Sequence, residues 1–132
     1  MKQKKNSISG TEPTKSELEI LQVLWKNGPS TVRFVNDDLN KQKRSVQYTS
    51  TLKLMQIMVE KNLLVRDESN MKHVYASCID EDKTKSVLLS RFVDSMFNGS
   101  ASSLVMQLLG NKKNSAKDIQ EIKDLLNKLD KS

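Results

Sequence analysis

The order of the periodic segments in residues 13–79 constrains the fold more than any other feature, because three helix-like stretches are followed at once by two strand-like runs. The first helix is expected to begin between Thr14 and Ser16, since Thr14 and Glu17 have the spacing of a capping box. It is expected to end before Gly28 and Pro29, which do not continue a helix. The apolar residues between these points recur at helical spacing and predict one buried face: Leu18, Leu21 and Trp25, widened by Ile20 and Leu24.

A second and a third helix follow closely. Ser30 or Thr31 can cap a helix of about three turns. A polar link then leads into a helix from about Gln47 to Lys61. The expected buried faces are Val32, Val35 and Leu39 in the second helix, and Thr51, Leu54, Met55 and Met58 in the third.

The segment after the third helix has the pattern of a β-hairpin. Two short runs, Leu63–Asp67 and His73–Ser77, have strand-like composition, and the polar segment Glu68–Lys72 joins them. Three helices followed by a hairpin describe a winged helix-turn-helix. The predicted fold class is therefore mainly α, of the α+β type, with such a domain as its head.

One face of the third helix is polar and carries side chains of modest length. A helix that follows another short helix through a brief turn is the element that enters the DNA major groove in this architecture. The alternative is an ordinary solvated helix face. The predicted base or groove contacts are Gln47, Tyr48, Thr49, Ser50, Lys53 and Gln56.

Positive charge is concentrated around this helix. The stretch from Lys41 to Lys72 holds seven basic residues against three acidic ones, a net charge of +4 out of +6 for the chain. Such an excess is typical of nucleic-acid binding, and an acidic membrane surface is the weaker alternative. The predicted phosphate contacts are Lys43, Arg44, Arg66, Lys72 and His73, although a lone histidine on a strand is more often an ordinary surface residue.

The residues after 80 have a different character. A helix from Asp80 to Phe97 carries too many apolar residues for one face, and two further helices are expected around Leu104–Leu109 and from Ser115 onwards. We expect part of this surface to meet a second copy of the chain, with packing within one chain as the alternative. The predicted dimer contacts are Phe92, Met96, Leu104, Leu108, Ile119, Ile122, Leu126 and Leu129. The domains are then residues 1–12 as a flexible basic tail, 13–79 as the DNA-binding domain and 80–132 as the helical dimerisation region.

The sequence offers little for catalysis, cofactors or metal binding. One cysteine, Cys78, and one histidine, His73, cannot supply a cysteine and histidine zinc cluster or an internal disulfide. The common hydrolase, nucleotide-binding and metalloprotease motifs are absent. We therefore expect a protein that is not an enzyme, without cofactor or metal. The single cysteine favours a reducing cytoplasm. The start of the chain lacks the apolar run of a signal peptide or membrane anchor, so we expect no membrane insertion.

Several runs closely resemble the penicillinase repressor family, known as the BlaI/MecI/CopY family. They are Tyr48–Met58, Glu60–Leu64 and Arg66–Ser69, with a further match from Thr14 to Trp25 and a looser one in the tail. The resemblance implies a homodimeric repressor that binds a palindromic double-stranded DNA operator through the third helix and the wing.

The resemblance also implies how repression is relieved. Many members are cut in the tail after a membrane metallopeptidase sensor detects a β-lactam. Gln107 and Leu108 stand where the antibiotic-responsive members have Asn-Phe, so the resemblance makes them the candidate cleavage site by position, while their residue types depart from the family's pattern. The copper-responsive members carry paired Cys-x-Cys motifs near the C-terminus, and Cys78 alone excludes copper sensing of that kind.

The functional prediction is thus a sequence-specific repressor that acts as a homodimer. The alternative is a winged-helix adaptor that binds other proteins through the same polar face without specific DNA binding. Retention on heparin and sensitivity to salt distinguish the two.

Overall fold

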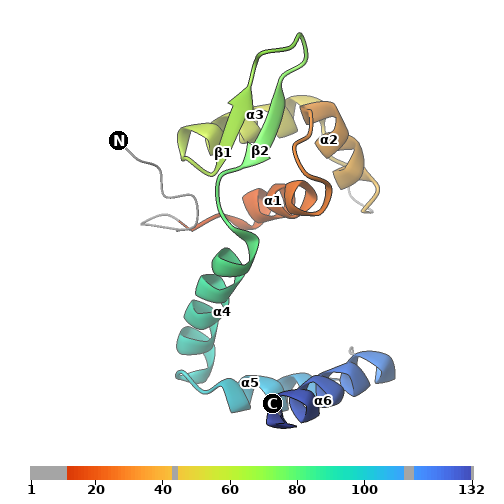
Figure 1. The fold of residues 1–132 in the computed structure, drawn as a ribbon, viewed down its shortest axis with the longest axis vertical. Coiled ribbons are helices and arrows are strands. Elements are labelled where there is room, and N and C mark those ends of the chain that lie inside the picture. Colours follow the sequence, from red (N-terminus) through yellow and green to blue (C-terminus); the bar gives the residue numbers. More distant parts are fainter. Residues whose placement is uncertain (1–11, 43–44, 112–114, 132) are drawn as a thin grey trace. The chain divides into compact units, whose positions relative to one another are not determined.

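A computed structural model describes residues 12–42, 45–111 and 115–131, with side chains up to residue 128. The chain divides into two compact units, one ending at Leu88 and one beginning at Leu89. The elements are, in order, α1 (Lys15–Asn27), α2 (Val32–Asn40), α3 (Tyr48–Glu60), β1 (Leu64–Asp67), β2 (Val74–Ser77), α4 (Glu81–Phe97), α5 (Ala101–Leu109) and α6 (Ala116–Lys131) (Figure 1).

Helix α1 begins and ends where the sequence predicts. The Thr14 side chain accepts a hydrogen bond from the Glu17 N–H, and the Glu17 side chain accepts one from the Thr14 N–H, so the predicted capping box is confirmed. At the other end, Gly28 has a φ of 82°, a left-handed value that favours glycine, and its N–H donates to the Leu24 carbonyl. The helix buries Ile20, Leu21, Val23 and Leu24.

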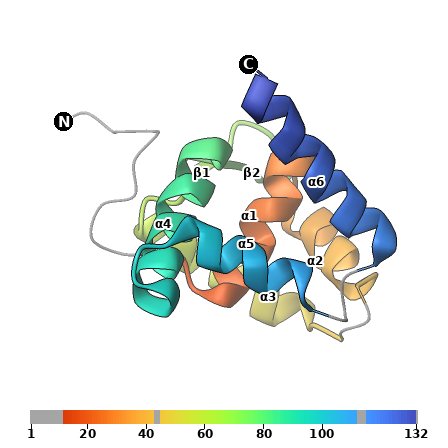
Figure 2. The same ribbon diagram turned by 90° about the horizontal axis from the view of Figure 1, so that it is seen from below.

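Helices α2 and α3 pack against each other and against α1, as the two views in Figure 1 and Figure 2 show. The Thr31 side chain caps α2 by accepting a hydrogen bond from the Phe34 N–H, which settles the choice between Ser30 and Thr31. Of the predicted buried faces, Leu54 is only half-buried. The others are buried, namely Val32, Val35 and Leu39 in α2 and Thr51, Met55 and Met58 in α3.

The predicted hairpin is present and has a short third partner. Strands β1 and β2 are antiparallel, with Leu64 opposite Ser77 and Asp67 opposite Val74. Ser30, two residues before α2, joins them, because its N–H donates to the Tyr75 carbonyl over 2.9 Å and the Tyr75 N–H donates to its carbonyl over 2.8 Å. The winged helix-turn-helix fold, mainly α with a small sheet, is therefore confirmed.

Trp25 lies at the edge of the core of the head. Its ring is half-buried, and its indole N–H donates to the Ser77 hydroxyl (3.1 Å) and to the Ile79 carbonyl (3.2 Å). A polar group at this depth needs such partners. The prediction that Trp25 belongs to the structural framework agrees with this position, in which it joins α1 to the end of the hairpin.

The second unit holds most of α4 together with α5 and α6. Asn98 and Gly99, which separate α4 from α5, have φ values of 52° and 81°, and the Ser100 side chain caps α5. Ser115 accepts a hydrogen bond from the Asp118 N–H at the start of α6. These helix breaks agree with the sequence prediction. The expected domain boundary between residues 79 and 80 stays a prediction.

Candidate nucleic-acid interface

Helix α3 presents the polar face that the sequence predicts. Thr51, Met55 and Met58 are buried, and because they fix the rotation of the helix, the residues between them turn outward. All six predicted groove contacts are exposed: Gln47, Tyr48, Thr49, Ser50, Lys53 and Gln56. The structure thus brings these side chains to the surface along α3, from its cap residue Gln47 to Gln56.

A buried amide holds the turn between α2 and α3. Asn36 is 3% exposed, and its Nδ2 atom donates to the Thr51 hydroxyl (2.8 Å) and to the Val46 carbonyl (3.0 Å). The neighbouring Asn40 accepts a hydrogen bond from the Val46 N–H through Oδ1 (2.6 Å). Sequence reasoning missed this network. Asn36 lies four residues after Val32 on the buried side of α2, and a polar residue there signals a buried partner.

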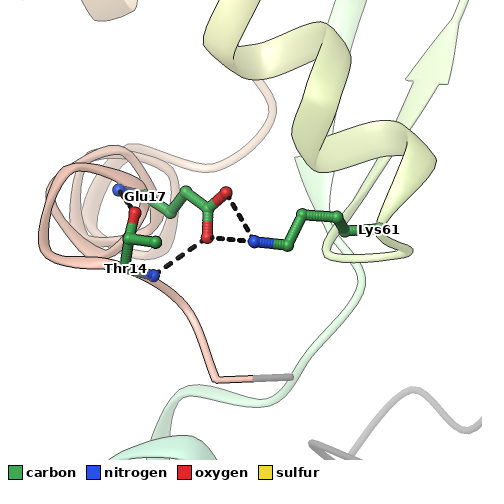
Figure 3. Close-up of polar contacts among 3 residues, drawn as sticks. All are labelled: Thr14, Glu17 and Lys61. Carbon is green, nitrogen blue, oxygen red and sulfur yellow. Dashed lines mark hydrogen bonds and ion pairs between the residues drawn. The ribbon is translucent and has the colours of Figure 1, made fainter. Parts of the chain in front are cut away.

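An ion pair fixes the other end of α3. Lys61, at the C-terminal end of the helix, donates from Nζ to both carboxylate oxygens of Glu17, over 2.9 and 2.8 Å (Figure 3). The Glu17 side chain is 3% exposed and that of Lys61 is 26% exposed. Because the same carboxylate also accepts the N–H of Thr14, one buried charge connects the start of α1 to the end of α3.

The basic residues of the wing differ in their partners. Arg66 on β1 is paired with Glu68, whose Oε2 accepts from Nε over 2.6 Å, whereas Lys72 is exposed at the end of the turn, next to the exposed His73. A hydrogen bond with Tyr75 and the contact with Glu68 raise the pKa of Arg66, so the guanidinium stays charged. Part of its charge is nevertheless balanced by a local carboxylate.

A carboxylate also shapes the wing turn. The Ser69 N–H donates to Asp67 Oδ1 over 2.9 Å, as in a turn closed by an aspartate side chain. The backbone and side-chain hydrogen bonds from Ser69 lower the pKa of Asp67. The carboxylate form therefore favours this turn.

Arg33 is a second residue that sequence reasoning missed. It is exposed on α2, and its guanidinium carbon lies 4.3 Å from the centre of the Tyr48 ring, a cation–π contact at the first turn of α3. The sequence signal for Arg33 was its position in the first turn of α2, two residues after the cap residue Thr31. The sequence prediction placed no DNA contact on α2.

The predicted dimer contacts lie in the helices of the second unit and in the last part of α4. Phe92 is 46%, Met96 63% and Leu126 45% exposed. Leu108 is exposed, while Leu104, Ile119 and Ile122 are half-buried. Three predicted site residues cannot be placed: Lys43 and Arg44 lie outside the described residues, and so does the side chain of Leu129.

Gln107 and Leu108 lie within α5 and are exposed. Within the described ranges, no three His, Cys, Asp or Glu side chains form a group that could hold a metal ion. The same part of the chain contains no helix long and apolar enough to cross a membrane.

Comparison with known proteins gives a consistent result. A family model described as "Penicillinase repressor" matches residues 13–128. The chain is 24% identical to a penicillinase repressor of Staphylococcus aureus, over 91% of this chain and 94% of that protein. It is 28% identical to a penicillinase repressor of Bacillus licheniformis, over 84% and 86% of the two chains. It is also 22% identical to the methicillin resistance regulatory protein MecI of Staphylococcus aureus, over 89% and 94%.

Proposed function

The chain belongs to the penicillinase repressor family of transcriptional repressors, and from this premise we propose that it acts as a homodimer on a palindromic DNA operator. The observation that carries the proposal is the exposed polar face of α3 beside a wing that bears exposed cations. A helix of this width and chemistry fits the major groove, where side chains can reach base edges.

The two groups of contact residues have different roles in the proposal. Lys53, with its neighbours Tyr48, Thr49 and Ser50, contacts base edges, and Gln47 and Gln56 extend the same face. The residues predicted for phosphate contact fix the register without reading sequence. These are Lys43, Arg44, Arg66, Lys72 and His73.

The tail supplies dimerisation in this proposal. Large apolar side chains exposed on α4, α5 and α6 need cover, and a second copy of the tail provides it with matching chemistry. A two-fold dimer then places two heads on two half-sites that are separated by one or more turns of DNA. Disrupting the tail is therefore expected to lower operator occupancy without changing the contacts of one head.

Proteolysis of the tail is the proposed route to relief of repression. The candidate bond between Gln107 and Leu108 lies inside α5, and a protease must bind it in an extended form. Cleavage consequently requires α5 to unwind locally first. In this proposal the repressor works in the cytoplasm, and a membrane metallopeptidase sensor transmits the signal.

Titration against DNA tests the proposal. The wild-type protein is measured against a duplex from the region upstream of its own gene and against a scrambled duplex, each at two salt concentrations. We expect tight, two-fold symmetric protection of the upstream duplex only. Equal weak binding to both duplexes would contradict the repressor function and favour the adaptor.

Two lysine variants separate the proposed roles. Lys53→Ala is expected to cost about 1–3 kcal/mol on the operator and little on scrambled DNA, because it removes a base contact. Lys72→Ala is expected to weaken binding to both duplexes alike and to reduce the salt dependence. Equal losses on both duplexes for Lys53→Ala would refute its assignment to a base edge.

A further inference from the structure

A groove of about 380 Å³ lies beside the first turn of α3. Its walls come from the start of α2, which contributes Thr31 and Arg33, from Tyr48 on α3, and from the wing, which contributes Lys72 and His73. Segments far apart in the sequence, with Arg33 and Lys72 separated by 39 residues, thus border one hollow of the head. One residue predicted for base contact, Tyr48, and two predicted for phosphate contact, Lys72 and His73, line it.

The charge of the groove points to an anion. Arg33 and Lys72 are both exposed and line it from α2 and from the wing, and none of the described residues that line it is acidic. Arg66, the other described cation of the wing, already has Glu68 as a partner. Arg33 and Lys72 are therefore the described cations best placed to meet an anion in this groove.

The contact between Arg33 and Tyr48 gives the arginine a defined position. At 4.3 Å from the ring centre, the guanidinium carbon is within the range of a favourable cation–π interaction. This contact holds the guanidinium over the ring face, and among the described residues its N–H groups have no hydrogen-bond acceptor. A planar guanidinium held in this way suits a phosphate group, which accepts two hydrogen bonds at once.

We propose that this groove is a phosphate clamp, in which Arg33 and Lys72 bind the same backbone phosphate of the DNA from opposite walls. Tyr48 is then a positioning residue that acts through Arg33. The proposal rests on the proposed function, because it takes DNA as the occupant. It deepens that function by adding an assignment on α2 and by placing two cations on one phosphate.

The position of the groove supports DNA rather than another anion as the occupant. The N-terminal turn of a recognition helix lies closest to the base edges, and a DNA strand passes along each side of the groove that it enters. A hollow between this turn and the wing therefore lies along the path of one strand. The lining also contains apolar surface from Met71 and Leu52, which suits the sugar edge of that strand.

The test measures the salt dependence of binding for Arg33→Ala, Lys72→Ala and the double variant, on the upstream duplex and on the scrambled duplex. Each neutralised phosphate contributes about 0.9 to the slope of log affinity against log salt. We expect each single variant to lose part of one such increment on both duplexes. We expect the double variant to lose about 0.9 in total, because both cations serve one phosphate.

Two further variants make the comparison specific. Lys26→Ala removes the same unit of charge from α1, at a different hollow that is lined by Glu19 and Glu81, and is expected to leave the slope unchanged. Arg33→Lys keeps the charge and loses the planar stacking, so it should keep most of the slope with weaker binding. Far-UV circular dichroism establishes that every variant is folded.

The possible outcomes separate this proposal from the function on which it rests. An unchanged slope for Arg33→Ala, with operator preference intact in the wild type, overturns the clamp and leaves the repressor function standing. A loss of about 1.8 in the double variant means two separate phosphates and also overturns the clamp. Equal binding to both duplexes by the wild type, with the expected slope losses, supports the clamp and refutes the sequence-specific repressor.

Discussion

Removing Lys61 is expected to destabilise the head more than neutralising its partner Glu17. The reason is the unequal burial of the pair: the carboxylate is 3% exposed, whereas the lysine side chain is 26% exposed. Lys61→Met leaves a buried negative charge with a single remaining hydrogen bond described, from the Thr14 N–H. Glu17→Gln keeps an oxygen that can accept this bond, and the freed ammonium can reach water on its flexible stem.

The magnitudes follow from these geometries. Breaking a buried ion pair by removing one partner lowers the free energy of unfolding by about 3–5 kcal/mol. Because Lys61 is partly exposed, we expect Lys61→Met to lose about 3 kcal/mol, at the lower end of this range. Glu17→Gln loses the charge-assisted contacts but strands no buried charge, so about 1–2 kcal/mol is expected. The double variant is expected to be more stable than Lys61→Met alone, since it no longer buries an unpaired charge.

Urea unfolding followed by the fluorescence of Trp25 measures these differences. Trp25 is the only tryptophan, and its indole hydrogen bonds lie within the head, so its signal reports on that unit. Lys26→Met is the control, because this exposed lysine of α1 should contribute within about 0.5 kcal/mol. Equal losses for Lys61→Met and Glu17→Gln, or a smaller loss for Lys61→Met, would refute the argument from unequal burial.

Three further outcomes are expected. Thr84→Val should stabilise the chain by about 1 kcal/mol in thermal unfolding, because the buried Thr84 hydroxyl has no hydrogen-bond partner among the described residues and valine has nearly the same shape. A loss of stability would mean that the hydroxyl has a partner. Glu68→Gln should tighten binding to all DNA, because it frees Arg66 for a phosphate, and unchanged titrations would show that this ion pair does not compete with DNA. The hydrogen bonds from Ser69 lower the pKa of Asp67, so the carboxylate stabilises the turn fully above its unfolded pKa of about 3.9. This stabilisation is lost as the pH falls through the lower pKa of the folded state. An NMR titration that gives an unshifted pKa for Asp67 would contradict this prediction.

The sequence was sufficient for features that depend on neighbours along the chain. The capping box at Thr14, the glycine stop at Gly28 and the buried faces of α2 and α3 arise from spacings of a few residues, which periodicity reveals. The exposed face of α3 follows directly from its buried face. The predicted groove contacts therefore all lie at the surface, although their contact with DNA stays a prediction.

Contacts between distant segments could not be predicted in the same way. Lys61 and Glu17 are 44 residues apart, and nothing in the spacing of either residue selects the other. The stacking of Arg33 on Tyr48 likewise depends on the angle between α2 and α3, which the Asn36 network helps to set. Periodicity identifies which face of a helix is buried, but tertiary packing decides which exposed side chains become neighbours.

The backbone pairing between Ser30 and Tyr75 has a consequence for the thermodynamics of DNA binding. Because two main-chain hydrogen bonds join Ser30, just before α2, to Tyr75 on β2, the two walls of the groove beside the first turn of α3 are ordered in the free protein. The conformational entropy cost of ordering these two walls is met when the head folds, so it does not weaken the binding of DNA. The head is thus preorganised for its ligand, and its association rate should be governed by electrostatic steering rather than by rearrangement of the wing.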